Sequence, residues 1–352
     1  MLRKCIHLLF LVVFVCFSRP LFADEVTIEK VAYHGWENCY KLTNGAVELI
    51  VVTDIGPRII HFGFVGQENI FRVAKNQLGK SDEEGFRGRG GHRFWVAPED
   101  PVTTYYPDNM PVDASIEGNT LRLVSTPELT DPALRKQYRS PRVVRDRMDD
   151  PKVRKALRLQ KKMNISLARD GMVTVEHIIK NWSDRSQVVA AWGISVLNKN
   201  GFAILPRAPY VPHNRESLLP TQRLITWSYT DLTDPRLHFM EKYIVVEQDP
   251  SIKKPVKIGI SNELGWAAYA WNTHLFVKYL TYNPDLDYPD MGASTEVYTG
   301  GNMLELESLG PLIGLEPNEE IRHVEEWRLF AIEPIKPKQE QIDRAVKQML
   351  KK

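Results

Sequence analysis

Short runs of alternating apolar and polar residues, separated by turn residues, make up most of the chain between residues 25 and 336. Asn44-Gly45 and Asp170-Gly171 each stand between two such runs, and this arrangement is a strong short-range signal for a β-hairpin. The other main strand candidates are residues 187–197, 223–229, 242–247, 266–271, 275–282, 295–299, 302–309 and 321–330. Many short strands with few helices indicate an all-β sandwich or barrel.

Two internal segments depart from this pattern. Residues 74–108 are rich in Gly, Pro and charge and predict a long loop system, which is a common place for functional residues. Residues 131–162 form a basic insertion, with 12 Lys or Arg against three Asp between positions 135 and 162. Pro151 is suited to open a short helix within it. The insertion is either a solvated charged face or a dock for an anionic polymer.

The two ends of the chain have patterns of their own. Residues 1–23 begin with Arg3-Lys4, continue through a largely apolar run and finish at Ala23, as a secretory signal peptide does. The apolar run is shorter than the about 18 residues expected of a membrane span. We therefore expect an exported protein, periplasmic or secreted, with no stable membrane insertion after cleavage; an uncleaved anchor is the alternative. Residues 337–352 have helical apolar spacing and predict a C-terminal helix after a sandwich at 24–336.

Charge and cysteine content exclude several classes of function. The chain has 46 Lys and Arg against 44 Asp and Glu, and loss of the leader would leave 43 against 44. This balance gives no reason to expect a nucleic acid as partner. Cys5 and Cys16 lie in the expected leader, so Cys39 would remain alone and could form neither an intrachain disulfide nor a cysteine metal site. No cofactor and no metal are expected.

The segment 302–309 places two carboxylates together. A period of two puts Glu305 and Glu307 on one face of a strand and Leu304 and Leu306 on the other. Neighbouring carboxylates push each other's pKa values apart, which suits general acid/base chemistry on a sugar. The same alternation is also what a half-exposed strand with an acidic face would show.

A glycine-rich segment supplies a second group of candidates. Gly90-Gly91 allows the backbone to approach a ligand closely, and the side chains that follow suit a sugar, with its apolar ring face and its hydroxyls. The histidine among them could equally be a structural one, and the tryptophan of 187–197 could stack on a sugar or fill the core. The expected substrate-binding residues are Arg93, Trp95, Glu99, Trp192, Lys278, Tyr288, Asp290 and Glu305, with His92 and Glu307 as catalytic candidates. The surroundings of Asp290 match no defined calcium loop.

Taken in order, these motifs resemble the galactose mutarotase-like superfamily, which includes the aldose 1-epimerases. Within it, the chain is most similar to a bacterial family of domains of unknown function. The resemblance runs from about Tyr33 to Phe330 and is carried by residues 53–59, 90–98, 181–184, 191–192, 288–292 and 304–311. It implies a β-supersandwich with a concave surface that faces a carbohydrate.

The resemblance also implies roles for single residues. In the sugar epimerases of the superfamily, a Glu on a late strand takes the proton of the anomeric hydroxyl, and a His donates one to the ring oxygen. Glu307 resembles that Glu. The strand that carries the His in the epimerases here has Ala190-Ala-Trp-Gly-Ile-Ser195 and no His, so His92 or Glu305 would have to replace it.

We therefore expect an exported protein that binds a mono- or oligosaccharide, neutral or anionic. If its site contains a general acid to work with Glu307, the protein would be a sugar epimerase or mutarotase. The alternative is a non-catalytic glycan-binding module of a cell-envelope or polysaccharide-processing system.

Overall fold

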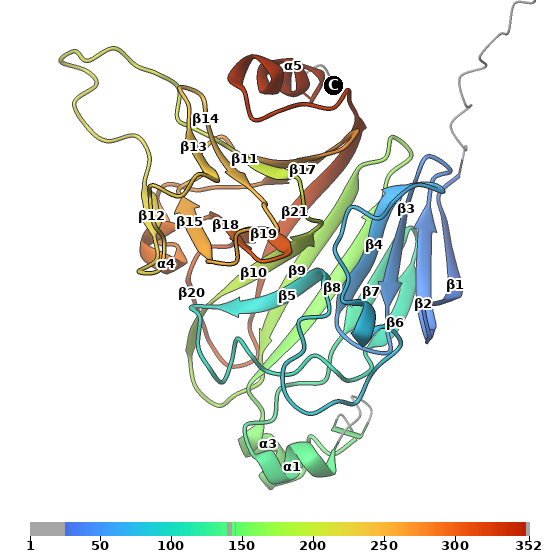
Figure 1. The fold of residues 1–352 in the computed structure, drawn as a ribbon. Helices are drawn as coiled ribbons and strands as arrows, with labels where there is room; N and C mark the ends of the chain where they lie inside the picture. The colour runs from blue at the N-terminus through green and yellow to red at the C-terminus, as the bar shows by residue number, and fades with distance from the viewer. Residues whose placement is uncertain (1–24, 139–142, 145, 350–352) are drawn as a thin grey trace, which may run out of the picture.

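The computed structural model describes residues 25–138, 143–144 and 146–349. The predicted leader, residues 1–23, lies outside these ranges. Within them the chain forms an eleven-stranded and a ten-stranded sheet, and all of their strand pairs are antiparallel (Figure 1). The predicted all-β sandwich is confirmed.

The first sheet carries the candidate site near its middle. From edge to edge its order is β1 (Thr27–Tyr33), β2 (Trp36–Thr43), β3 (Val47–Val52), β4 (Arg58–Phe64), β5 (Gly91–Ala97), β10 (Gln187–Leu197), β19 (Met303–Leu309), β18 (Thr295–Gly300), β15 (Val256–Ile260) and β12 (Leu224–Thr226), while β20 (Ile313–Leu315) also pairs with β10. The predicted hairpin at Asn44-Gly45 joins β2 to β3.

The second sheet lies across the first. Its order is β13 (Leu237–Phe239), β14 (Tyr243–Glu247), β11 (Phe202–Pro206), β16 (Trp266–Trp271), β17 (His274–Leu280), β21 (Glu320–Ala331), β9 (Val173–Asn181), β8 (Leu159–Leu167), β7 (Thr120–Val124) and β6 (Asp113–Glu117). The predicted hairpin at Asp170-Gly171 joins β8 to β9. Between β11 and β12, residues 207–223 extend away from the body as a long loop (Figure 1).

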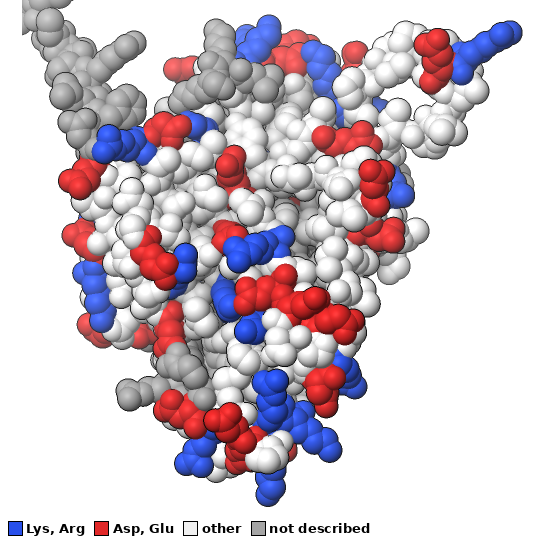
Figure 2. Space-filling view, turned by 180° about the vertical axis from the view of Figure 1, so that it is seen from behind, with Lys and Arg blue, Asp and Glu red and all other residues white. Residues whose placement is uncertain are grey.

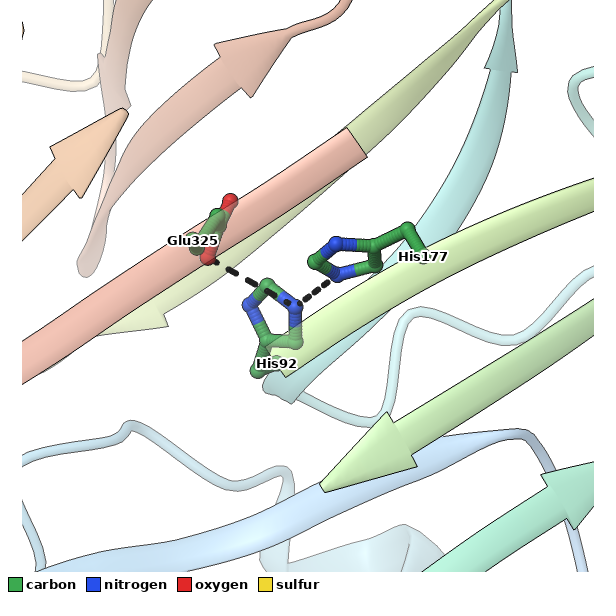
Figure 3. A group of neighbouring side chains, drawn as sticks. All are labelled: His92, His177 and Glu325. Carbon is green, nitrogen blue, oxygen red and sulfur yellow. Dashed lines mark hydrogen bonds and ion pairs between the residues drawn. The ribbon is translucent and has the colours of Figure 1, made fainter. Parts of the chain in front are cut away.

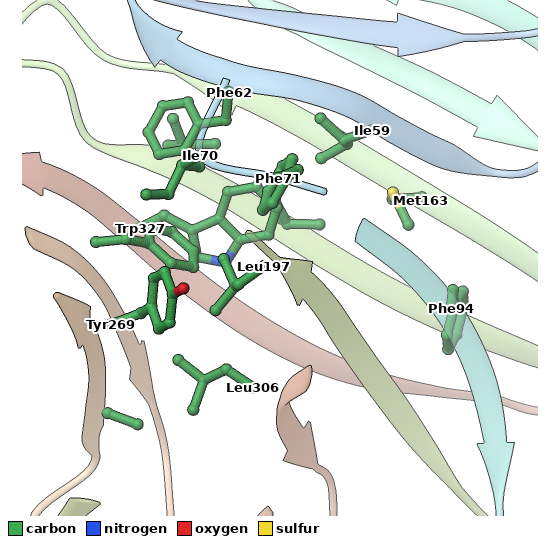
Figure 4. Packing of buried hydrophobic residues seen from close by; sticks show 14 of the residues in the cluster. Ile59, Phe62, Ile70, Phe71, Phe94, Met163, Leu197, Tyr269, Leu306 and Trp327 are labelled. Carbon is green, nitrogen blue, oxygen red and sulfur yellow. The ribbon is translucent and has the colours of Figure 1, made fainter. Parts of the chain in front are cut away.

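The main core fills the space between the two sheets, because alternate residues of each strand point into it. Trp327 of β21 stands at its centre, with its ring centroid 5.9 Å from those of both Phe62 of β4 and Phe71 of the segment that follows β4 (Figure 4). Leu306 of β19 reaches the same space, so the inner side of a site strand belongs to the core. Aromatic contacts of this kind hold the two sheets in register.

Helices are few and short. The C-terminal helix is α5 (Gln339–Met349), and its buried residues pack against the outer side of the second sheet, including Ile204 and Trp266. In the basic insertion, α1 (Pro132–Gln137) and α3 (Pro151–Ala156) each begin after an aspartate whose side chain accepts backbone N–H groups. The predicted start at Pro151 is therefore confirmed.

Two further short helical elements are η1 (Lys75–Gln77) and α4 (Pro289–Gly292). None of the helices in the described part of the chain is long and apolar enough to cross a membrane.

Residues 74–108 are less irregular than the sequence predicts. They contain η1 and the whole of β5, whose seven residues are all buried. The Gly and charged residues on either side hid a strand that pairs with β4 and β10. The error matters for the site, because a strand sorts its side chains to two faces and a loop does not.

Both signs of charge are spread over the face seen in Figure 2, including the lower end, where α1 and α3 lie. On this face, the described part of the basic insertion is therefore not uniformly positive.

Candidate functional site

A cavity of about 540 Å³ lies on the first sheet, on the face turned away from the core. Strand alternation decides which side chains reach it: Leu304 and Leu306 of β19 point into the core, and Glu305 and Glu307 line the cavity, as the sequence predicts. Its lining includes Arg93 and Trp95 of β5, Trp192 of β10, Glu305 and Glu307 of β19, Tyr298 of β18, Lys257 of β15, and Phe86, Glu99, Tyr105 and Tyr229 of connecting segments.

Two tryptophans form an aromatic wall of this cavity. Trp95 and Trp192 are directly opposite each other on neighbouring strands, with ring centroids 5.3 Å apart and planes at 82°. Phe86 and Tyr105 pack edge-on against Trp95. Trp192 also belongs to a small apolar cluster on this side of the sheet. Mutual contact therefore fixes the orientation of the wall before any ligand arrives.

A lysine between two carboxyl groups forms the charged end of the cavity. The ammonium of Lys257 lies 2.6 Å from Glu296 Oε2 and 3.3 Å from Glu307 Oε2. Burial raises the pKa of Glu307 and raises that of Glu296 well above its ordinary value. Burial works against the charge of Lys257, but Glu307 and Glu296 still raise its pKa. One cation neutralises one carboxylate, so we infer that the pair Glu296 and Glu307 together keeps one proton.

A second ion pair stands beside the aromatic wall. Arg93 Nη2 donates to Glu305 Oε1 over 2.9 Å, and the guanidinium lies over the Trp95 ring at 4.3 Å from its centroid. The Tyr105 hydroxyl donates to Glu99, and burial, followed by Glu99, raises the pKa of Tyr105 to about 12. The cavity thus combines aromatic side chains with fixed donors and acceptors.

Comparison with known proteins gives the fold. No protein-family model and no curated protein matches the chain. A solved putative aldose 1-epimerase from Klebsiella pneumoniae superposes with a TM-score of 0.52 at 12% identity, over 92% of this chain and 86% of that one. A galactose mutarotase-like protein from Lactobacillus casei gives 0.50 at 10% identity, over 83% of this chain and 100% of that one.

The chain has a galactose mutarotase-like fold. The resemblance seen in the sequence is confirmed at this level, and identities of 10% and 12% show the fold alone. A TPR-domain containing protein from Parabacteroides distasonis also superposes, with a TM-score of 0.52 at 13% identity over 85% of this chain. This chain spans 48% of the length of that protein.

On this galactose mutarotase-like fold, the structure brings six of the ten predicted site residues to one cavity and places four elsewhere. Those at the cavity are Arg93, Trp95, Glu99, Trp192, Glu305 and Glu307. Those outside its lining are His92, Lys278, Tyr288 and Asp290. Which of the predicted residues line the cavity is decided by the strand face or turn on which each lies, and not by their separation in the sequence.

His92 lies on the wrong face of β5 to reach Glu307. It is fully buried on the core side, where Nδ1 is 3.0 Å from Ser195 Oγ and Nε2 is 2.7 Å from His177 Nε2 (Figure 3). Period-two alternation on β5 sends Arg93 and Trp95 to the cavity and His92 away from it. The predicted pairing of His92 as acid with Glu307 as base is therefore not formed.

Lys278 belongs to the same buried polar cluster. Its ammonium lies 2.8 Å from Glu325 Oε1 and donates to the carbonyl oxygens of Leu306 and Gly193. Burial lowers the pKa of Lys278 as well as those of His92 and His177. Lys278 thus supports the backbones of β19 and β10 from the side opposite the cavity.

The histidines of the cluster have a complete set of hydrogen bonds in one tautomeric arrangement. His177 Nδ1 donates to the carbonyl of His323, His92 Nε2 donates to His177 Nε2, and His92 Nδ1 accepts from Ser195. His92, His177 and Glu325 also offer one ligand atom each, and these three atoms lie within 4.8 Å of one another, close enough to surround a metal ion. Lys278 already supplies a positive charge next to Glu325.

Tyr288 and Asp290 belong to the turn that contains α4. The Tyr288 hydroxyl accepts from the backbone N–H of Asn283, and its ring stacks on Tyr282 at 4.9 Å. Asp290 has a φ of 51°, in the left-handed region, inside the turn. These positions give the two residues a role in shaping the turn, away from the cavity lining.

Sequence reasoning missed Lys257, Tyr298 and Tyr229. Lys257 had a usable signal, because it is a single charge inside the otherwise apolar strand Val256–Ile260. Tyr298 shares a strand face with Glu296, two residues earlier, and pairs with Glu305 across β18 and β19. Tyr229 lies in a segment of turns and gave no such signal.

Proposed function

We propose that this protein binds a carbohydrate in the cavity of the first sheet. The observation that carries the proposal is the fixed tryptophan pair beside two ion pairs, Arg93 with Glu305 and Lys257 with Glu307. A sugar ring has apolar faces that pack on aromatic rings and hydroxyls that both donate and accept hydrogen bonds. The volume of about 540 Å³ lies within the range of roughly 300–1,000 Å³ typical of small-molecule sites.

Charged side chains in this arrangement would orient the sugar. Glu305 and Glu307 accept from hydroxyls, and Arg93 and Lys257 donate to them, so neighbouring hydroxyls can each be satisfied. Tyr229 and Tyr298 add hydroxyl groups to the same lining. Export to the periplasm or beyond is part of this proposal, and its support is the leader-like sequence of residues 1–23.

Mutarotation is the second candidate, and Glu307 is the observation that favours it. Its carboxyl group lines the cavity, and burial raises its pKa toward the range in which a base works well near neutral pH. Glu307 would take the proton of the anomeric hydroxyl as the ring opens. None of the described residues that line the cavity is a histidine, so binding without turnover is the function that the geometry supports best.

Exchange NMR tests both functions in one experiment. The wild-type protein should shift or broaden the signals of at least one sugar in a panel of neutral and acidic monosaccharides, in a saturable way. A mutarotase would in addition speed exchange between the anomers. If no sugar in the panel responds to the folded protein, the binding proposal fails.

Two variants, Glu307→Gln and Glu326→Gln, test whether Glu307 is the catalytic base. If the wild type speeds exchange, Glu307→Gln should abolish that effect and keep the binding response, since the amide keeps the shape and cannot take a proton. Glu326→Gln, at an exposed position on β21, is the matched control. Undiminished exchange in Glu307→Gln would remove Glu307 from the catalytic role and leave the binding proposal standing.

A further inference from the structure

A second cavity, of about 400 Å³, lies between the basic insertion and the loop that precedes β5. It shares no lining residue with the first cavity. Residues 82–85 line the second cavity, and Phe86 and Gly88 of the same loop line the first. The two cavities are therefore neighbours with separate walls.

Buried charges on its wall do not balance. Asp108 is paired with Arg58, and Glu128 Oε2 accepts from Arg158 Nη2 over 3.0 Å. Lys161 is a third cation, 5% exposed, and its ammonium lies 3.8 Å from Glu128 Oε1. In this buried group three cations stand against two carboxylates, although Arg58 and Arg158 are not themselves in the lining.

Lys161 lies at a position of β8 where the period-two alternation predicts a core residue. It shares a face of β8 with Leu159 and Met163, both of which are fully buried in the core. A buried ammonium needs hydrogen-bonded partners, and among the described residues that of Lys161 has a distant ion pair with Glu128 and the charge of Asp108, but no hydrogen bond. The cavity is where a further partner can come from.

Several polar atoms at this cavity have no hydrogen-bond partner among the described residues. They are Asp108 Oδ1, Glu128 Oε1, Thr126 Oγ1 and Arg135 Nε. Two of these are acceptors, one is a donor, and the hydroxyl is both. A ligand that satisfied all of them would need hydroxyl groups as well as an acceptor for the arginine.

The rest of the lining is apolar and aromatic. Tyr106, Met110, Leu129 and Tyr138 contribute to it, and the Arg135 guanidinium lies over the Tyr106 ring at 5.0 Å from the centroid. Acidic residues 82–84 stand in the same lining, so a compact dianion would be repelled more strongly than a single carboxylate.

We propose that this second cavity binds an acidic sugar, a hexuronate ring or chain end. Its carboxylate would pair with Lys161 and Arg135, its hydroxyls would donate to Asp108 Oδ1 and Glu128 Oε1, and one ring face would pack on the aromatic side chains. A simple anion would leave the free acceptors and the apolar wall unused. A neutral sugar would supply no anion for Lys161 and Arg135.

Methyl NMR on the wild-type protein tests this without any substitution. Met110 lines the second cavity and Met303 the first, so a sample labelled at methionine methyl groups reports on both. Titration with D-galacturonate should shift Met110 in a saturable way, while D-galactose and acetate at equal concentrations should not. Failure of the first cavity to bind any sugar would appear at Met303 and would leave this result unaffected.

Substitutions then test which cation of the second cavity pairs with the carboxylate of galacturonate. Lys161→Leu should weaken the galacturonate response of Met110 by about ten-fold or more, because it removes a charge-assisted partner. Lys162→Leu, one residue further along β8 and on its other face, is the matched control. Arg135→Gln, at a half-buried position on α1, provides a second test if Lys161→Leu does not fold.

Four outcomes would overturn the proposal. They are no saturable shift of Met110 in the folded wild type, an equal response to acetate, an equal response to galactose, and a galacturonate response confined to Met303. The last would assign the acidic sugar to the first cavity. A response of Met110 that survives both Lys161→Leu and Arg135→Gln would also contradict the assigned contacts.

Discussion

The indole Nε1 of Trp192 donates a hydrogen bond to Glu307 Oε2 over 2.9 Å. One residue therefore both forms part of the aromatic wall and holds the carboxylate that we propose faces the sugar. The ammonium of Lys257 lies 3.3 Å from the same oxygen. The ionised form of Glu307 is stabilised by two donors, against the cost of its burial.

Trp192→Phe should raise the pKa of Glu307 further. The variant keeps an aromatic ring and removes a donor that favours the charged carboxylate. Carboxyl NMR titration of Glu307 measures the change. Trp95→Phe, which alters the other half of the ring pair, should move that pKa less. An unchanged or lowered pKa in Trp192→Phe would show that the hydrogen bond does not form in solution.

Lys257→Met should destabilise the fold by about 3–5 kcal/mol, because it leaves two buried carboxyl groups without their cation. Urea unfolding monitored by tryptophan fluorescence gives the free energy of unfolding. Glu296→Gln in the same chain should restore part of the loss. Lys254→Met, which breaks an exposed pair with Asp231, should change stability by about 1 kcal/mol or less. Equal effects of the two lysine substitutions would contradict the buried role of Lys257.

Gly193→Ala should cost about 2 kcal/mol or more, because a Cβ there would stand 2.3 Å from Glu325 Oε1, inside the buried polar cluster. Gly314→Ala is the matched comparison, since in the described part of the chain nothing lies within 4 Å of a Cβ at that position. Thermal unfolding of the two variants measures the difference. Equal melting temperatures would mean that the cluster can move aside at little cost.

Stability should fall as pH is lowered below about 6.5. Burial lowers the pKa of His323 to about 3, and an unfolded histidine titrates near 6.5. Between these values the unfolded chain binds a proton that the folded chain does not, so unfolding becomes easier by about 1.4 kcal/mol per pH unit for this residue. His92 and His177 act in the same direction.

Urea unfolding between pH 7 and pH 5 measures this slope. The window lies above the range in which most carboxyl groups of the unfolded chain titrate. Glu296 and Glu307, whose pKa values burial raises, take up protons in the folded chain at higher pH and so oppose the histidines. Comparison with His323→Gln isolates the histidine, and this variant should give a shallower slope than the wild type. Equal slopes in the two proteins would contradict the buried neutral state of His323.

Local alternation explains what the sequence could predict. The hairpins at Asn44-Gly45 and Asp170-Gly171, the helix at Pro151 and the two faces of 302–309 depend on neighbours along the chain, and each is confirmed. The same reasoning failed at Gly91–Ala97, because its glycines and charges hid a strand. His92 was then grouped with Arg93 and Trp95, although alternation separates them.

Pairing between distant strands explains what the sequence could not predict. β10 lies between β5 and β19, which are far apart in sequence, and this order is what brings Trp192 next to Trp95 and Glu307. Lys257 reaches Glu307 only because β15 and β18 follow in the same sheet. No periodicity within one segment contains that information.

The alternation of β5, β10 and β19 has a consequence for how the binding specificity of this protein can change. Cavity side chains such as Trp95 and Glu305 occupy one parity of each strand, and the residues that hold the sheets together occupy the other. The outward positions are not all equivalent, because Trp192, Ile194 and Leu309 form a buried apolar cluster of their own on that face. A mutational library that varies Glu305 and Met303 and keeps this cluster would sample new ligands with the least effect on folding.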